Sequence, residues 1–318
     1  MKALCFNSFG GPEVLYYGEV PEPVIGENEL LIKNKAIGLN FADIYRRKGN
    51  YHLTGKTPFI AGYEGAGEVV RVGRNITDIQ IGDRIGFADV PLANAEFVAV
   101  PYEKAIPLPD HISFEMAAAS LLQGLTAQYL ISDSYTVKSG DTALIHAAAG
   151  GVGQLLVQLC KHSGAKVIGL TSSEEKRQTV LNTGADEALL YTDDWKKHLK
   201  EQSKVDVVFE SIGSTLMDSF EVTKVSGTVV FYGFSGGNPP LIDPRMLMDN
   251  SQTLTGGDLW SYLTSREERL KRSSVLFDWI SKNIVTINVS KTFALSDGAA
   301  AHQYLESRKS TGKILLIP

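Results

Sequence analysis

Residues 144–157, LIHAAAGGVGQLLV, decide the fold. They read as an apolar strand, a turn of small residues and an apolar helix, the setting in which a glycine turn binds phosphate. The turn residues are Gly150, Gly151, Val152 and Gly153. Glycine lets the backbone approach a pyrophosphate, and the helix start offers unpaired N–H groups and the positive end of a dipole. Ala148 stands where the plain G-x-G-x-x-G pattern has its first glycine, so the turn is a variant of that pattern.

Apolar strands alternate with helices on the C-terminal side of this turn. Strands are expected at 142–148, 166–171, 187–191, 205–210, 228–233 and 252–256. Helices are expected to begin near Gly151, Glu174, Asp193, Thr215 and Pro244, and a longer helix is expected at 266–283. This alternation predicts an α/β fold, a Rossmann domain whose doubly wound parallel sheet of six strands binds a dinucleotide.

The first 120 residues have a different pattern. Short runs with many β-branched residues lie between dense turns, and strands are expected at 29–36, 67–72, 84–87 and 95–100. This predicts a compact, mostly β domain. The spacing becomes helical near residue 112, with Ser113 as the helix cap. The last stretch, 285–318, is too short to form a domain and should pack on one of the other two.

Composition limits the class of protein. The chain has 318 residues, 43% of them hydrophobic, and a formal charge of −5, which indicates a folded globular protein of roughly two domains. The negative charge argues against nucleic acid and anionic membranes as partners. No apolar run approaches the ~20 residues that a membrane-spanning helix needs. Cys5 and Cys160 are too few for a disulfide framework, and we expect a cytoplasmic protein.

The end of the second parallel strand indicates which dinucleotide binds. NAD-binding domains carry an acidic residue there for the ribose 2′-hydroxyl, whereas this strand ends in Thr171, Ser172 and Ser173. Hydroxyl groups can donate to a 2′-phosphate, and Lys176 or Arg177 can neutralise it, so we expect NADPH. The alternative is that these two cations belong to a solvated helix face shared with the acidic residues Glu174 and Glu175.

Five motifs, in this order, resemble the zinc-independent quinone oxidoreductases. They are AIGLNFADIYRRKGNY (36–51), AGYEGAGEVVRVG (61–73), GDRIGF (82–87), AAASLLQGLTAQYL (117–130) and HAAAGGVGQLLVQL (146–159). That family is the zeta-crystallin-like branch of the medium-chain dehydrogenase/reductase superfamily. The resemblance implies a GroES-like domain at 1–120 completed by 285–318, and a Rossmann domain at 121–284. It also implies an NADPH-holding cleft and a homodimer, usually formed by joining the sheet edges of two Rossmann domains.

The resemblance also assigns site residues. It places the four turn residues under the pyrophosphate, Ser172 and Lys176 at the 2′-phosphate, and Tyr191 at the adenosine phosphate end. Weaker cofactor assignments are Ser211, Phe234 and Leu259. Residues on the nicotinamide and substrate side are Asn40, Tyr45 and Thr126, with Tyr51 near the mouth. Structural alternatives exist, because Tyr191 suits a strand end, Thr126 suits a hydrogen bond to its own helix backbone, and Asn40 suits a turn cap.

No metal is expected. Zinc-bearing relatives hold the metal with a cysteine and a histidine at the positions of Asn40 and Tyr63, which cannot supply those ligands. A quinone is electron-poor and accepts hydride without a metal, provided that the protein positions it against the cofactor and excludes water. Asn40 and Tyr45 are candidate donors to the developing oxyanion, with the final proton coming from solvent. Asp43 and Glu64 are weak acid–base candidates, and a structural role in the Gly-rich turn suits Glu64 better.

Two other functions stay open. The same cleft would suit reduction of the C=C bond of an enone or enoyl thioester. Arg46, Arg47 and Lys48 would then form a basic rim for a thioester carrier, or else a solvated helix face. A function of another class is a non-catalytic NADPH-binding interaction module or RNA-binding protein, which the charge of −5 disfavours. His146 follows an apolar strand and is interpreted as a packed core histidine.

Overall fold

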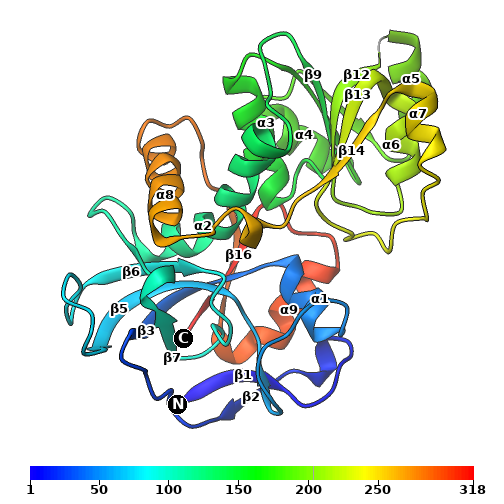
Figure 1. Cartoon of the computed structure of the whole chain (residues 1–318). Coiled ribbons are helices and arrows are strands. Elements are labelled where there is room, and N and C mark those ends of the chain that lie inside the picture. Colours follow the sequence, from blue (N-terminus) through cyan, green and yellow to red (C-terminus); the bar gives the residue numbers. More distant parts are fainter. Residues whose placement is uncertain (203) are drawn as a thin grey trace. The chain divides into compact units, whose positions relative to one another are not determined.

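The computed structural model describes residues 1–202 and 204–318. Their contacts form two compact units (Figure 1). Unit 1 contains Met1–Gln123, Leu263–Ser281 and Ile287–Pro318. Unit 2 contains Gly124–Tyr262 and Lys282–Thr286. The contacts therefore group Leu263–Ser281 with unit 1. The sequence instead assigns this segment to the Rossmann domain. The functional domain boundaries stay a prediction.

Unit 2 is built on a six-stranded parallel sheet in the order β11-β10-β9-β12-β13-β14. In chain order of its strands this is 3-2-1-4-5-6, the doubly wound arrangement. The strands are β9 Thr142–Ile145, β10 Lys166–Thr171, β11 Glu187–Leu190, β12 Val205–Glu210, β13 Thr223–Phe231 and β14 Thr253–Gly256. The helices are α3 Gly151–His162, α4 Glu174–Asn182, α5 Trp195–Gln202, α6 Leu216–Val222 and α7 Arg245–Asn250. The predicted parallel-sheet domain is confirmed.

The central strands of unit 2 are apolar on both faces. Leu144 of β9, Ile168 of β10 and Val208 of β12 belong to one buried cluster on one face, which Leu199 of α5 and Phe220 of α6 also join. The alternate residues Ala143, Val167 and Val207 are buried too, and helices lie on both sides of the sheet (Figure 1). Because the strands are parallel, the carboxyl ends of β9, β10, β11 and β12 lie at one edge of the sheet. That edge is where ligands of this architecture bind.

Strand β9 is shorter than its sequence predicts. It ends at Ile145 and not at residue 148, because Ala147 adopts a positive φ of 47° and turns the chain out of the sheet. In the opposite direction, β13 begins at Thr223, five residues before the predicted start at 228, directly after α6. A turn ends β9 early, and β13 follows α6 without the longer connection that the sequence predicts. Hydrophobic pattern alone does not mark such boundaries.

Unit 1 contains two sheets. The seven-stranded sheet runs β15-β16-β3-β5-β6-β8, with β7 also paired to β3, and the three-stranded sheet runs β2-β1-β4. The larger sheet consists of β3 Glu29–Leu39, β5 Glu64–Val72, β6 Arg84–Ala88, β7 Phe97–Pro101, β8 Ile106–Pro107, β15 Val289–Ala294 and β16 Lys313–Ile317. The smaller one consists of β1 Lys2–Phe6, β2 Tyr16–Glu19 and β4 Phe59–Ile60. Strand β16 pairs antiparallel with β3, so the C-terminal stretch packs on the β domain.

Unit 1 also contains helices. They are α1 Phe41–Arg47, α8 Arg266–Ser281 and α9 Gly298–Glu306, and α2 Phe114–Tyr129 begins in this unit. Ser113 caps α2 as predicted, because its hydroxyl accepts the Met116 N–H at 3.1 Å. The sequence did not predict α9, whose GAAAHQYLE run is short and carries few large apolar residues.

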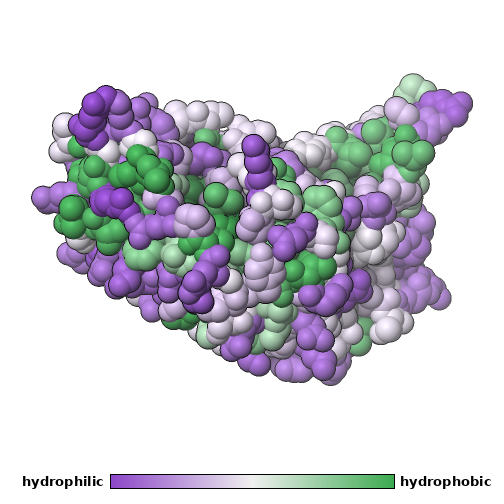
Figure 2. All heavy atoms as spheres, turned by 90° about the horizontal axis from the view of Figure 1, so that it is seen from below, coloured by the Kyte–Doolittle hydropathy of each residue, from purple (hydrophilic) through white to green (hydrophobic). Residues whose placement is uncertain are grey.

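Polar side chains separate the apolar ones on the surface. On the face drawn in Figure 2, hydrophobic residues form separate patches between polar residues. The large exposed hydrophobic side chains of the chain include Val24, Leu241 and Met248. No helix in the described part of the chain is both long and apolar enough to cross a membrane. Cys5 and Cys160 are free thiols, and both are buried.

Candidate functional site

The glycine turn lies at the carboxyl edge of the unit 2 sheet, between β9 and α3. Gly150 is the N-cap of α3, and Gln154 donates its N–H to the Gly150 carbonyl at 2.9 Å. The first turn of α3 carries no acidic residue. A Cβ on Gly153 would collide with the Ala147 carbonyl oxygen and lie 2.8 Å from the Ala148 Cα. Gly153 therefore lets α3 begin against the turn, which leaves the helix N-terminus available to an anion.

The neighbouring strand end carries hydroxyl groups, as predicted. Ser172 is exposed beyond β10, and Ser173 caps α4 by accepting the Lys176 N–H at 3.4 Å. Arg177 forms an ion pair with Glu174 at 3.2 Å. For Arg177 this agrees with the alternative that it belongs to a solvated helix face. Lys176 is half-buried in the first turn of α4, close in sequence to Ser172. The donor set at this edge fits a 2′-phosphate.

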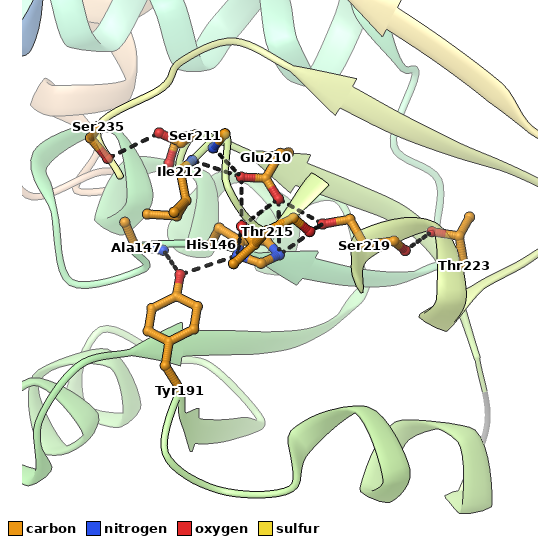
Figure 3. A network of polar contacts seen from close by, with 11 residues as sticks. His146, Ala147, Tyr191, Glu210, Ser211, Ile212, Thr215, Ser219, Thr223 and Ser235 are labelled. Atoms are coloured by element: carbon orange, nitrogen blue, oxygen red, sulfur yellow. Dashed lines mark hydrogen bonds and ion pairs between the residues drawn. The ribbon is translucent and has the colours of Figure 1, made fainter. Parts of the chain in front are cut away.

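Tyr191 follows β11, and its side chain points toward the start of the glycine turn (Figure 3). Its hydroxyl oxygen accepts the Ala147 N–H at 2.9 Å and lies 3.1 Å from Nδ1 of His146. His146 is completely buried, as its apolar context predicts. Burial lowers the pKa of His146, which the charges of Glu210 and Asp218 oppose.

Glu210 ends strand β12 on the other side of His146 (Figure 3). Its Oε1 accepts the N–H groups of Ile212 and Gly213 at 2.7 and 3.1 Å. The hydroxyl of Thr215 lies 2.9 and 3.0 Å from its two carboxylate oxygens, and Ser219 donates to Oε2 at 2.6 Å. Ser219 also lies 3.1 Å from His146 Nε2. We refer to Tyr191, His146, Glu210, Thr215 and Ser219 as the strand-end network.

The remaining predicted residues of unit 2 lie in different surroundings. The Ser211 carbonyl accepts the Ser235 hydroxyl at 3.0 Å, and a Cβ on Gly213 would approach Phe234 to 3.0 Å. Leu259 and Thr126 are buried, with 4% and 9% of their surface exposed. The cofactor or substrate roles of Ser211, Phe234, Leu259 and Thr126 stay predictions.

Unit 1 holds a second buried polar group around Asn40, the N-cap of α1. Lys313 of β16 forms a 2.5 Å ion pair with Oε2 of Glu64. Lys313 also donates to Asn40 Oδ1 at 2.8 Å, and Gln123 donates to the same oxygen at 3.3 Å. The Asn40 amide donates to Glu64 at 2.9 Å, and Glu64 also accepts the Leu122 N–H at 2.6 Å. We call Asn40, Glu64, Gln123 and Lys313 the Asn40 network.

Asp43 and Arg46 lie beside this network on α1. Asp43 accepts the Asn40 N–H at 2.9 Å, which supports the capping alternative for Asn40. Burial raises the pKa of Asp43, although Arg46, 3.5 Å away, opposes the shift. The Arg46 guanidinium lies 3.4 Å from the Tyr63 ring centroid and 4.9 Å from that of Tyr51. Arg46 therefore joins the predicted aromatic position Tyr51 to the network.

The prediction of a basic rim or a solvated face at residues 46–48 is wrong for both arginines. Arg46 and Arg47 have 2% and 0% of their surface exposed. Arg47 donates to the Gly10 carbonyl at 3.1 Å and to Glu306 at 2.6 Å. Lys48 is exposed and also pairs with Glu306, at 2.6 Å. For Arg47 the reason is α9, which carries Glu306 and which the sequence did not predict. Arg46 instead donates to the His52 carbonyl at 3.1 Å and lies over the Tyr63 ring.

Tyr45 lies on the same helix as the buried arginines. Its side chain is half-buried, and its ring centroid is 6.3 Å from that of Phe41. Tyr51 is also half-buried and contacts His52, with ring centroids 4.0 Å apart. Both stay predicted substrate-side residues.

Sequence reasoning missed three buried polar residues, Lys313, Glu210 and Ser219. Two signals were available. Lys313 is the charged residue of an otherwise apolar strand, KILLI, and Glu210 ends the strand VDVVFE at the ligand-binding edge. A charge at such a position is expected to have a partner, but the sequence does not say which one. Among the described residues, no group of three or more His, Cys, Asp or Glu side chains is placed to hold a metal ion.

Comparison with known proteins agrees with this geometry. The alcohol dehydrogenase GroES-like domain model matches residues 26–139, and the zinc-binding dehydrogenase model matches residues 151–271. A quinone oxidoreductase of Pseudomonas aeruginosa is 37% identical over 100% of this chain and 99% of its own length. A 2-haloacrylate reductase of Burkholderia is 36% identical over the same shares. The crystal structure of Escherichia coli quinone oxidoreductase complexed with NADPH superposes with a TM-score of 0.96, at 38% identity, over 100% of both chains.

The chain belongs to the zinc-independent quinone oxidoreductases of the medium-chain dehydrogenase/reductase superfamily. Its fold is a GroES-like domain combined with a Rossmann domain, as the sequence predicts. The match to the family named zinc-binding dehydrogenase begins at residue 151, so it includes neither Asn40 nor Tyr63. At the second of these positions, the Tyr63 hydroxyl accepts the Thr54 N–H at 3.3 Å, and its ring faces Arg46. A guanidinium occupies the ring face there, which is unlike the surroundings of a zinc ligand.

Proposed function

We propose that this protein is an NADPH-dependent quinone reductase. The observation that carries the proposal is the hydroxyl-lined end of β10, with Ser172 and Lys176 in place of a carboxylate. It occurs in a chain that matches an NADPH-complexed quinone oxidoreductase over its full length. NADPH supplies the hydride when bound.

The residues of the chain supply binding and orientation. The start of α3 and the glycine turn hold the pyrophosphate, and Lys176 with Ser172 holds the 2′-phosphate. We assign donation to the developing quinone oxyanion to Tyr45, because the Asn40 amide already faces Glu64 at 2.9 Å and the Gly38 carbonyl at 3.4 Å. The final proton comes from solvent.

The test is oxidation of NADPH by the purified chain, followed by loss of NADPH absorbance. A series of simple quinones is compared with an enone, an enoyl thioester and a 2-haloacrylate, with NADH as the control cofactor. Turnover that is fastest with quinones and NADPH supports the proposal. Turnover restricted to the unsaturated acids or enones contradicts it.

Reduction of a conjugated C=C bond is the second candidate function. The observation that favours it is the 36% identical relative named 2-haloacrylate reductase, since a haloacrylate carries a C=C bond next to a carboxylate. The buried arginines of α1 do not favour a thioester carrier, because neither Arg46 nor Arg47 is exposed to bind its phosphates. Small unsaturated acids or enones are therefore the substrates to test in this class.

Cofactor choice has its own test. We expect Lys176→Ala to raise the KM for NADPH about 10-fold or more and to change the KM for NADH little, since a charge-assisted hydrogen bond is worth ~1.5–3 kcal/mol. Arg177→Ala is the matched control on the same helix, because Arg177 pairs with Glu174. If the KM values for NADPH and NADH change equally, Lys176 does not bind the 2′-phosphate.

We also propose that the reaction uses no zinc, since Asn40 and Tyr63 cannot replace the cysteine and histidine of zinc-bearing relatives. Metal analysis should find no stoichiometric zinc, and a chelator should leave turnover unchanged. Loss of turnover with the chelator contradicts this.

We further propose a cytoplasmic homodimer. Strand β14 is the last strand at one end of the unit 2 sheet, so a second copy can continue the sheet there. The preceding segment exposes Leu241 and Met248, which such an interface would cover. Sedimentation of the purified protein tests the dimer, and a monomeric mass contradicts it. Free Cys5 and Cys160 suit a reducing compartment, which cell fractionation tests.

A further inference from the structure

We propose that Arg46 is a positioning residue for the electron acceptor: it holds residues 51–54, which we call the Tyr51 segment, in place beside α1. Arg46 acts through this segment and does not itself bind the acceptor. The inference rests on the proposed function, in which Tyr51 lies on the substrate side. All the residues concerned belong to unit 1.

The Tyr51 segment lies in the connection between α1 and β4. Its four residues, all within the described part of the chain, lie outside helices and strands. His52 and Thr54 are exposed, whereas Leu53 packs against a buried apolar cluster. A connection of this kind keeps one conformation only where it finds partners in the rest of the fold. The partners of the segment therefore decide where Tyr51 lies.

Arg46 makes its best hydrogen bond to this segment. Its Nε–H donates to the His52 carbonyl at 3.1 Å. Its Nη1 lies 3.5 Å from Asp43, at the outer limit of a hydrogen bond, and its Nη2 has no hydrogen-bond partner among the described residues. The residue is nonetheless buried, with 2% of its surface exposed. The bond to the His52 backbone is therefore the one that fixes the direction of the side chain.

Two aromatic rings also contact the Arg46 guanidinium. It lies 3.4 Å from the centroid of the Tyr63 ring and 4.9 Å from that of the Tyr51 ring. Tyr63 is buried just before β5, and its hydroxyl accepts the Thr54 N–H at 3.3 Å. Arg46 therefore joins the start of the segment to a buried ring beside the sheet, and the same ring holds the end of the segment at Thr54.

The burial of Arg46 is costly for stability. A buried guanidinium loses its hydration, and the long contact with Asp43 offsets little of that loss. A methionine would fill a similar space without this cost. A methionine cannot, however, donate to the His52 carbonyl or attract the two rings as a cation does. What Arg46 contributes is therefore the position of the Tyr51 segment.

The test compares Arg46→Met with Arg84→Met in the full chain. Arg84 is the matched control in unit 1, because it lies over the Phe114 ring at 4.9 Å and donates to the Pro109 carbonyl at 3.3 Å. The KM and kcat for a simple quinone are measured at saturating NADPH. The dissociation constant of NADPH is measured by calorimetry without quinone, and the Tm of each variant is recorded.

We expect Arg46→Met to raise the KM for the quinone about 5- to 10-fold, because the segment occupies its binding position for a smaller fraction of the time. The dissociation constant of NADPH should stay unchanged, and Arg84→Met should change neither value. A wild-type KM for the quinone in Arg46→Met overturns the inference. So does an equal weakening of quinone and NADPH, or an equal rise in KM in Arg84→Met, since either shows a general loss of structure.

A second measurement follows the segment without turnover. Lys56 is exposed two residues after Thr54, so trypsin cleavage after Lys56 reports release of the segment. We expect this cleavage to be faster in Arg46→Met than in wild type and in Arg84→Met, and to precede cleavage elsewhere in the chain. Equal rates after Lys56 in wild type and Arg46→Met contradict the inference.

A double-mutant cycle shows whether Arg46 acts through Tyr51. Tyr51→Leu removes the ring that Arg46 positions. In that background, Arg46→Met should raise the KM for the quinone by about twofold at most, because the two changes act on one contact. If the full 5- to 10-fold rise persists without the Tyr51 ring, Arg46 does not act through Tyr51 and the inference fails.

Arg46→Lys keeps the inference testable if Arg46→Met does not fold once Asp43 loses its cation. Lysine keeps the charge beside Asp43 but lacks the planar group that contacts the Tyr63 ring while donating to His52. We expect a smaller rise in the KM for the quinone and faster cleavage after Lys56, with the dissociation constant of NADPH unchanged. Wild-type values of both KM and cleavage in Arg46→Lys overturn the inference.

Failure of the inference and failure of the proposed function give different results. A wild-type protein that reduces an enone or a 2-haloacrylate but no quinone contradicts only the proposed acceptor, and the KM comparison is then made with that substrate. A wild-type protein that reduces none of them contradicts the proposed function, and the role of Arg46 in acceptor binding with it. Cleavage after Lys56 still measures whether Arg46 holds the segment.

Discussion

Each unit of this molecule buries a carboxylate completely, and the two are stabilised in different ways. In unit 1, Glu64 meets the ammonium group of Lys313 at 2.5 Å, and both side chains are at most 1% exposed. In unit 2, Glu210 accepts hydrogen bonds from two backbone N–H groups and two hydroxyls, beside His146, whose pKa is lowered by burial. One unit neutralises the charge with an opposite charge, and the other solvates it with dipoles.

The difference decides what a substitution costs. A buried ion pair that loses one partner leaves an uncompensated charge, whereas a carboxylate with several neutral donors keeps most of them when one is removed. The Asn40 network should therefore break at a single residue, and the strand-end network should weaken by steps. The predictions below test this contrast, beginning with the largest effect.

The first prediction removes the cation of unit 1. Lys313→Met keeps the length of the side chain but leaves Glu64 buried without its ion-pair partner. We expect the free energy of unfolding to fall by about 3–5 kcal/mol, measured by urea denaturation.

The control for Lys313→Met is the double variant Glu64→Gln/Lys313→Met, which carries no unpaired charge. It should be more stable than the single variant. A double variant that is equally unstable shows that packing at Lys313, and not its charge, supports unit 1.

The second prediction concerns His302 of unit 1, which is completely buried and lies 3.3 Å from Arg47. Burial and the nearby Arg47 charge lower the pKa of His302 to about 3 from its ordinary 6.5. The unfolded chain therefore binds the proton first as the pH falls. The stability due to neutral His302 is complete above pH 6.5 and is lost as the pH falls toward 3.

Between pH 6.5 and 3, the free energy of unfolding of the wild type falls as the pH falls. We expect this fall to be smaller in His302→Gln, by roughly 1.4 kcal/mol for each pH unit. Denaturation at several pH values measures the slope. A variant whose slope equals that of wild type would mean that His302 is protonated in the folded protein.

The third prediction removes one donor from the strand-end network. In Ser219→Ala, Glu210 loses one hydrogen bond, and His146 Nε2 loses the hydroxyl oxygen 3.1 Å away. The N–H groups of Ile212 and Gly213 still donate to Glu210. The free energy of unfolding should fall by about 1–2 kcal/mol. A loss as large as that of Lys313→Met would remove the contrast between the two units.

The smallest effect is expected at an exposed carboxylate. Lys161 and Asp186 are paired at 2.7 Å, but their side chains are 36% and 37% exposed. Lys161→Met should lower the free energy of unfolding by ~0.2–1 kcal/mol, and this difference should shrink in high salt. A larger fall in the free energy of unfolding that does not depend on salt would contradict this prediction. It would mean that the difference in burial does not explain why the Glu64–Lys313 pair matters more than the Lys161–Asp186 pair.

Local patterns predicted the parts of the fold that depend on neighbours in sequence. The strands Lys166–Thr171 and Val205–Glu210 have the predicted bounds, and α3 and α4 begin at Gly151 and Glu174 as predicted. Short elements were missed where local pattern is weak. The nine residues of α9 acquire their helix from packing on β16 and β15, and their absence from the prediction made Arg47 look solvated.

The sequence by itself determined the class of this protein. The glycine turn, the alternation of strands and helices, the strand end without a carboxylate and the motifs of the first 130 residues all follow from residues close together in the chain. Only the tertiary structure decided how its buried charges are paired. Lys313 and Glu64 are 249 residues apart, and Ser219 and His146 are 73 apart. A polar side chain signals that it needs a partner, but strand order and register choose which one it meets.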